Sequence, residues 1–144
     1  MFRQVLVICV GNICRSPVAE EILRKLSLAD KVVSAGIEGL SGERAHPYAV
    51  EVSKENGVDL SHHIAQKVQV NHIKDADLIL CMEEEHISAI TSIYPYASGK
   101  TFLLGHWENK KEIHDPYQKP KEAFITMFNH VELSAMEWAK KLQA

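Results

Sequence analysis

A strand-like run that leads through a polar loop into a helix constrains the fold of this chain more than any other feature. Residues 5–10 are all apolar, which is typical of a parallel strand covered on both faces. The run leads into a segment with Gly11, Asn12 and Ser16, and a helical pattern begins just after Pro17. This order favours an α/β protein with right-handed crossovers, in which ligands bind at the carboxyl ends of the strands.

The loop carries a cysteine and an arginine at a spacing suited to a tetrahedral anion. Five residues separate Cys9 from Arg15, so the chain can curl and aim successive backbone N–H groups at one oxyanion beside a helix N-terminus. The Arg15 guanidinium offers a planar fork to two oxygens, and the same surroundings stabilise a cysteine thiolate. A buried strand cysteine beside a surface arginine is the ordinary alternative, which the strand-loop-helix placement disfavours. The candidate phosphate-binding residues are Val10, Gly11, Asn12, Ile13, Cys14 and Arg15.

Further segments along the chain repeat the alternation of strand and helix. Ser16 is expected to cap the first helix, with Pro17 at its first position. Strands are expected at residues 5–8, 31–35, 78–82 and 101–104. Helices are expected after Pro17, from Pro47 to Asn56, from Glu83 onward and over residues 124–142; the glutamates at 83–85 suit the dipole of the helix that they open. The sequence therefore predicts one domain over residues 1–144, a three-layer α/β sandwich with a central four-stranded parallel sheet and the phosphate-binding loop after its first strand.

Composition limits the partners and the compartment. The 144 residues carry a formal net charge of −3 with mixed signs, which gives no indication of nucleic-acid binding. The sequence has no apolar stretch of transmembrane length and no signal-peptide pattern, so we expect a cytoplasmic protein without membrane insertion. Its three cysteines make a poor disulfide framework. No His and Asp cluster has the spacing of metal ligands, so neither a metal nor another cofactor is expected.

The motif from Cys9 to Arg15-Ser16 resembles the signature of the low-molecular-weight protein-tyrosine phosphatases. The resemblance covers nearly the whole chain. It continues through Ser34-Ala35-Gly36, Pro47, Ala49-Val50, residues 57–62, residues 77–82 and Asp115-Pro116-Tyr117. Within the family, Gly105-His106-Trp107-Glu108 and Glu112-Ile113 are similar to the bacterial branch that dephosphorylates tyrosine autokinases of capsule and exopolysaccharide export.

The resemblance implies a function and a set of site residues. The chain would hydrolyse protein phosphotyrosine through a cysteinyl-phosphate on Cys9, with Arg15 holding the phosphoryl oxygens and Asp115 protonating the leaving group. Its expected partners are a phosphotyrosine protein, such as a tyrosine autokinase, and inorganic phosphate or other oxyanions in the loop. The Ser16 hydroxyl would donate to the Cys9 thiolate. The other expected site residues are Asn12, Ser34 and His62, which would support the loop by hydrogen bonds, and Leu40 and Tyr117, which would form the pocket walls.

Other functions of the same loop stay open at this stage. Arsenate reductases share the fold and the loop but need two further cysteines; Cys81 lies in an apolar run and residues 82–89 contain no second one. A phosphocarrier domain would need neither Arg15 nor an acid such as Asp115. A nucleotide-binding loop is excluded, because no Gly-Lys-Ser/Thr follows.

A second cysteine in the loop suggests redox control. Cys14 lies in the same loop as Cys9, and an exposed thiolate is readily oxidised to sulfenic acid. A Cys9–Cys14 disulfide would then protect Cys9 from irreversible oxidation.

Overall fold

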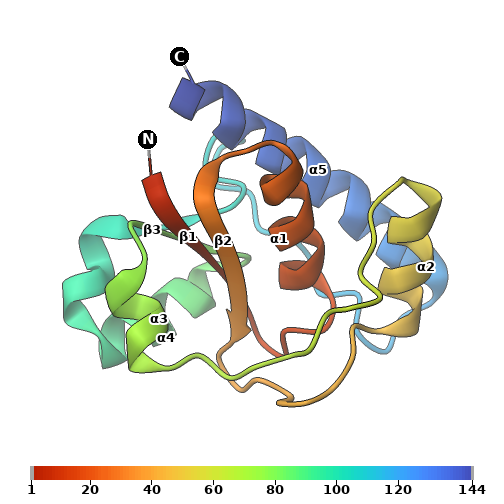
Figure 1. Ribbon diagram of the computed structural model, residues 1–144, viewed down its shortest axis with the longest axis horizontal. Coiled ribbons are helices and arrows are strands. Elements are labelled where there is room, and N and C mark those ends of the chain that lie inside the picture. Colours follow the sequence, from red (N-terminus) through yellow and green to blue (C-terminus); the bar gives the residue numbers. More distant parts are fainter. Residues whose placement is uncertain (1, 144) are drawn as a thin grey trace.

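Four parallel strands form the centre of the computed structural model, which describes residues 2–143 (Figure 1). The strands are β1 (Phe2–Cys9), β2 (Ala29–Gly36), β3 (Leu78–Cys81) and β4 (Thr101–Leu103). They pair in the order β2-β1-β3-β4. Cys9 of β1 is in register with Gly36 of β2, and Ile8 with Cys81 of β3. The carboxyl ends of the strands therefore meet at one edge of the sheet.

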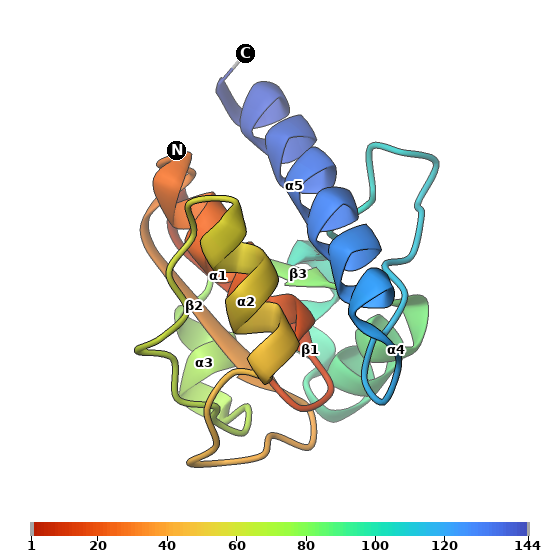
Figure 2. The same ribbon diagram turned by 90° about the vertical axis from the view of Figure 1, so that its right-hand side faces the viewer.

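Helices cover both faces of the sheet. Figures 1 and 2 show α1 (Arg15–Lys25), α2 (Pro47–Glu55) and α5 (Lys121–Gln143) on one face. The other face is covered by α3 (Val70–Asp75), α4 (Glu84–Ile93) and the 3-10 helix η1 (Pro95–Lys100). Alternate residues of β1 point to opposite faces, so Val5 and Val7 pack under α1 and α5 while Leu6 and Ile8 pack under α3 and α4. The result is the three-layer α/β sandwich predicted from the sequence.

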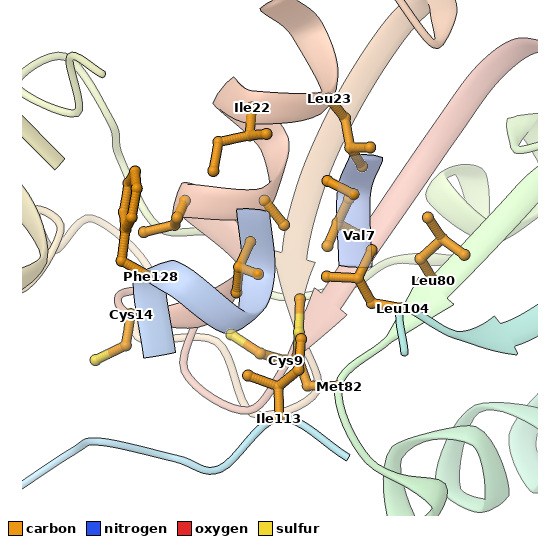
Figure 3. Packing of buried hydrophobic residues seen from close by; sticks show 14 of the residues in the cluster. Val7, Cys9, Cys14, Ile22, Leu23, Leu80, Met82, Leu104, Ile113 and Phe128 are labelled. Carbon is orange, nitrogen blue, oxygen red and sulfur yellow. The ribbon is translucent and has the colours of Figure 1, made fainter. Parts of the chain in front are cut away.

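The larger core reaches the carboxyl edge of the sheet. Figure 3 shows Cys9 at the border of this cluster, with Met82 and Ile113 drawn beside it. The indole N–H of Trp138, on α5, donates to the carbonyl oxygen of Leu104 at 2.8 Å, which fixes the C-terminal helix against the end of β4. The edge that carries Cys9 is thus backed by packed side chains.

The structure corrects two expectations about the helices. First, α1 begins at Arg15, so Ser16 lies within its first turn and makes no capping bond to the backbone. Second, α3 and η1 were not expected, because each has six residues and is too short for a clear helical periodicity. In the segment that the structure describes, no helix is long and apolar enough to cross a membrane.

Candidate active site

Cys9 lies at the point where β1 ends and the loop before α1 begins. Its side chain is almost fully buried, with 2% of the residue exposed. Its Sγ lies 2.8 Å from the hydroxyl oxygen of Ser16, in the first turn of α1. A hydroxyl at this distance can donate to a thiolate. Ser16 therefore contacts the sulfur of Cys9, and this contact takes the place of the capping bond expected from the sequence.

Asn12 holds the loop through both its backbone and its side chain. Its φ of 61° is left-handed, a conformation that asparagine tolerates better than most residues. Its Nδ2 donates to the hydroxyl oxygens of Ser16 at 2.8 Å and Ser34 at 2.9 Å. Its Oδ1 accepts from the backbone N–H of Gln66 at 3.0 Å. The buried amide thus connects the loop to α1, to β2 and to the segment before α3.

A histidine contacts the loop one position later than expected. The side chain of His62 is 60% exposed, and its Nε2 lies 3.3 Å from Glu21 on α1. The neighbouring His63 is 10% exposed, and its Nε2 donates to the carbonyl oxygen of Asn12 at 2.7 Å. The expectation for His62 is corrected in this respect. Adjacent residues in a turn point in different directions, and the turn closed by the His63 N–H and the Leu60 carbonyl directs His63 inward.

Arg15 is buried and held by acceptors from two other loops. It is 1% exposed, and its Nη1 donates to Glu83 Oε2 at 2.5 Å and to the Ile113 carbonyl oxygen at 2.8 Å. Its Nη2 lies 3.7 Å from Asp115 Oδ2. Sequence reasoning missed Glu83, because three consecutive glutamates at a helix start were explained by the helix dipole alone. The signal that could have found it is a carboxylate directly after a buried strand end.

Cys9 and Arg15 line one pocket of about 250 Å³ at the carboxyl edge of the sheet, whereas Asn12, Ser16 and Glu83 lie behind its lining. Leu40 and Tyr117 line it and are 38% and 46% exposed. Asp115 lies in its wall and accepts the Tyr117 backbone N–H at 3.1 Å. The other lining residues include Cys9, Ile13, Cys14, Arg15 and Glu38. A tetrahedral anion on the loop would thus lie between a thiol, a guanidinium and a carboxyl group.

The surroundings of the other two cysteines, Cys14 and Cys81, favour a protonated thiol. Burial, together with the nearby Cys9 and Asp115, raises the pKa of the Cys14 thiol to about 12. Cys81 is fully buried in β3, and this burial raises its thiol pKa. Both thiols are therefore protonated near neutral pH. Within residues 2–143, His, Cys, Asp and Glu side chains form no group of three that could hold a metal ion.

Known proteins that are similar to this chain over almost its whole length identify its family. The family model described as low molecular weight phosphotyrosine protein phosphatase matches residues 4–144. A putative low molecular weight protein-tyrosine-phosphatase of Klebsiella pneumoniae is 44% identical, over all of both chains. The structure of Vibrio vulnificus Wzb in complex with benzylphosphonate is 46% identical, with a TM-score of 0.94, over 98% of this chain and 99% of that one.

A more distant relative has a different named activity. The YwlE arginine phosphatase from Geobacillus stearothermophilus is 32% identical, with a TM-score of 0.91, over 98% of this chain and 93% of that chain. The family match spans almost the whole sequence and agrees with the motif at residues 9–16. The chain belongs to the low molecular weight protein-tyrosine phosphatase family.

Proposed function

We propose that the chain hydrolyses protein phosphotyrosine in two steps, with Cys9, Arg15 and Asp115 in the reacting positions. In the first step the Cys9 thiolate attacks phosphorus, the S–P bond forms and the P–O bond to tyrosine breaks. Asp115 gives its proton to the leaving phenolate, whose conjugate acid has a pKa of about 10. In the second step Asp115 takes a proton from water, which attacks phosphorus and releases phosphate and the thiolate.

One observation carries this assignment. The Cys9 sulfur, the Arg15 guanidinium and the Asp115 carboxyl group converge on one pocket, although Asp115 lies far along the sequence from the loop that carries the other two. The loop N–H groups and Arg15 would hold the equatorial oxygens, and the Ser16 hydroxyl would stabilise the thiolate as the leaving group of the second step. Asn12, Ser34 and His63 would support the loop, and Leu40 and Tyr117 would flank the substrate ring.

We further propose a tyrosine autokinase of polysaccharide export as the physiological substrate, dephosphorylated in the cytoplasm. The support is the resemblance of residues 105–108 and 112–113 to the bacterial branch of the family. Inorganic phosphate is then the product that leaves the loop. An arginine phosphatase is the second candidate, favoured by the match to the Geobacillus structure.

A single assay separates these functions. Peptides with phosphotyrosine, phosphoserine or phosphoarginine are incubated with the chain, and released phosphate is measured; arsenate reduction is measured in parallel with a thiol. We expect rapid release from phosphotyrosine only. Preferential release from phosphoarginine would overturn the proposal in favour of the second candidate.

Two cysteine variants test the covalent step. Cys9→Ser should lose turnover but still bind the phosphopeptide, because the loop donors and Arg15 remain. Cys81→Ala is the matched control, since Cys81 lies in β3 outside the pocket. Acid quenching during turnover should trap phosphate on the wild-type and Cys81→Ala chains alone. Substantial turnover by Cys9→Ser would exclude Cys9 as the nucleophile.

A further inference from the structure

One carboxylate in the pocket wall has no role in the proposed reaction. Glu38 follows β2 and lines the same pocket as Leu40 and Tyr117. It is exposed and, within the described residues 2–143, forms no salt bridge. Asp115, the other acid of the wall, lies 3.7 Å from Arg15. Glu38 therefore places a negative charge at the pocket with no cationic side chain of the described residues at ion-pair distance.

The segment that carries Glu38 is fixed to the phosphate-binding loop. Four consecutive backbone N–H groups, from residues 37–40, donate to the carbonyl oxygens of Cys9, Val10 and Gly11 at 2.9–3.1 Å. Gly39 in this segment has a φ of 54°, and a Cβ there would lie 2.3 Å from the Cα of Lys67. These contacts hold the backbone of Glu38 at a constant place relative to the phosphate site. A charge on a rigid support discriminates better than one on a mobile loop.

We propose that Glu38 selects phosphotyrosine substrates that have Lys or Arg beside the phosphotyrosine. This inference rests on the proposed function. A phosphotyrosine ring that reaches Cys9 must pass between Leu40 and Tyr117, so the substrate backbone lies over the rim where Glu38 is exposed. A basic neighbour is then attracted by the carboxylate, and an acidic neighbour is repelled. Repulsion between Glu38 and the phosphate itself is common to all phosphotyrosine peptides and cancels in their comparison.

The effect should be modest, because the carboxylate is exposed to water. Exposed ion pairs change equilibria by about 1.5-fold to 5-fold. Attraction for one peptide and repulsion for another act together, so kcat/KM should differ by about 3-fold to 10-fold between basic and acidic peptides at low salt. The difference should shrink at about 0.5 M salt, where screening is strong.

The experiment compares matched peptides and matched variants. Each peptide has phosphotyrosine flanked on either side by Lys, Ala or Glu, and phosphate release gives kcat/KM. The variants are Glu38→Gln, Glu38→Lys and the control Glu43→Gln, which removes a charge from the same exposed segment outside the pocket wall. A small aryl phosphate without flanking residues reports on the reaction itself.

The wild type and Glu43→Gln should prefer the Lys peptides, Glu38→Gln should lose most of the preference, and Glu38→Lys should prefer the Glu peptides. The rate of each variant on the small aryl phosphate includes any change in repulsion between residue 38 and the phosphate, and it is the reference by which that variant's peptide rates are divided. Equal rates on every phosphotyrosine peptide, or an unchanged preference in Glu38→Gln, would overturn the role of Glu38 and leave the phosphatase function intact. Failure to hydrolyse any of the peptides would instead overturn the proposed function.

Discussion

Oε2 of Glu83 lies 2.5 Å from Nη1 of Arg15, and this contact joins the loop after β3 to the start of α1. The same Nη1 donates to the carbonyl oxygen of Ile113, two residues before Asp115. Arg15 is thus clamped on one side of its guanidinium, and Nη2 is the nitrogen on the side of Asp115. A buried guanidinium without its carboxylate partner is costly. The orientation of Arg15 therefore depends on Glu83.

We expect Glu83→Gln to lower kcat/KM for phosphotyrosine by about 10-fold to 100-fold, which corresponds to about 1.4 to 2.7 kcal/mol of lost transition-state stabilisation. The inhibition constant of inorganic phosphate should rise with it, because a loosened Arg15 binds oxyanions poorly. Glu84→Gln, a change at the exposed neighbour on α4, is the control. Tighter phosphate binding in Glu83→Gln would mean that Glu83 only neutralises the charge of Arg15.

The two contributions of Asn12 can be separated by two substitutions. Asn12→Gly keeps the left-handed backbone accessible but removes the bonds to Ser16, Ser34 and Gln66. Asn12→Ala removes the same bonds and adds the backbone cost of a left-handed alanine, about 1 kcal/mol. Both should lower kcat/KM and the melting temperature, and Asn12→Ala should lower the melting temperature further. Wild-type rates in Asn12→Gly would show that backbone conformation alone shapes the loop.

The role proposed for Asp115 predicts a dependence on the leaving group. Asp115→Asn should lower phosphotyrosine turnover by about two to four orders of magnitude, the usual range for general acid catalysis. For an aryl phosphate with a strongly acidic phenol, Asp115→Asn should lower the rate of the burst of phenol release much less, since that phenolate departs without a proton. Equal losses for both substrates would indicate that Asp115 only shapes its loop.

The redox hypothesis for Cys14 is now more specific. In this scheme peroxide oxidises the Cys9 thiolate to a sulfenic acid, and the Cys14 thiol displaces water from it to form the disulfide. Because the Cys14 pKa is raised to about 12, closure should be slow at neutral pH and accelerate as the pH rises. After peroxide and then thiol, activity should return in the wild type and much less in Cys14→Ser. Equal recovery in both proteins would exclude Cys14 as the resolving thiol.

Acid should destabilise the fold through its buried histidines. His86 lies 3.6 Å from Glu83, with a side chain 4% exposed, and burial lowers its pKa below 6.5. The unfolded chain then binds a proton at a pH where the folded chain does not. The contribution of neutral, buried His86 to the free energy of unfolding is therefore fully present above about pH 6.5 and is lost as the pH falls. The free energy of unfolding, measured by chemical denaturation, should fall less between pH 7.5 and pH 5.5 for His86→Gln than for the wild type or for the exposed control His62→Gln. The same loss in all three proteins would remove His86 from this linkage.

Burial also lowers the pKa of other histidines, His46, His72 and His130, so some acid sensitivity should remain.

The fold could be predicted further than the details of the site. The apolar strands and the strand-loop-helix order of residues 5–17 predicted the parallel sheet and the edge that holds the pocket, because both follow from local pattern. The choice between His62 and His63 depends on the direction of a turn, and no local sequence pattern indicates which of two adjacent residues in a turn points inward. The pairing of Glu83 with Arg15 joins residues that are 68 positions apart; the position of Glu83 after a buried strand places it at the edge of the site, but no local pattern identifies Arg15 as its partner.

The site divides into a buried floor and an exposed rim. Cys9, Asn12 and Arg15 of the floor are fixed by buried hydrogen bonds, so a substitution there disturbs the whole network. Leu40 and Tyr117 of the rim are exposed, and within residues 2–143 their side chains form no hydrogen bond to the loop. Mutations at the rim can therefore change which substrates bind while the hydrogen bonds of the floor stay intact. A phosphatase built in this way can acquire new protein substrates by drift at a few surface positions, while its reaction stays the same.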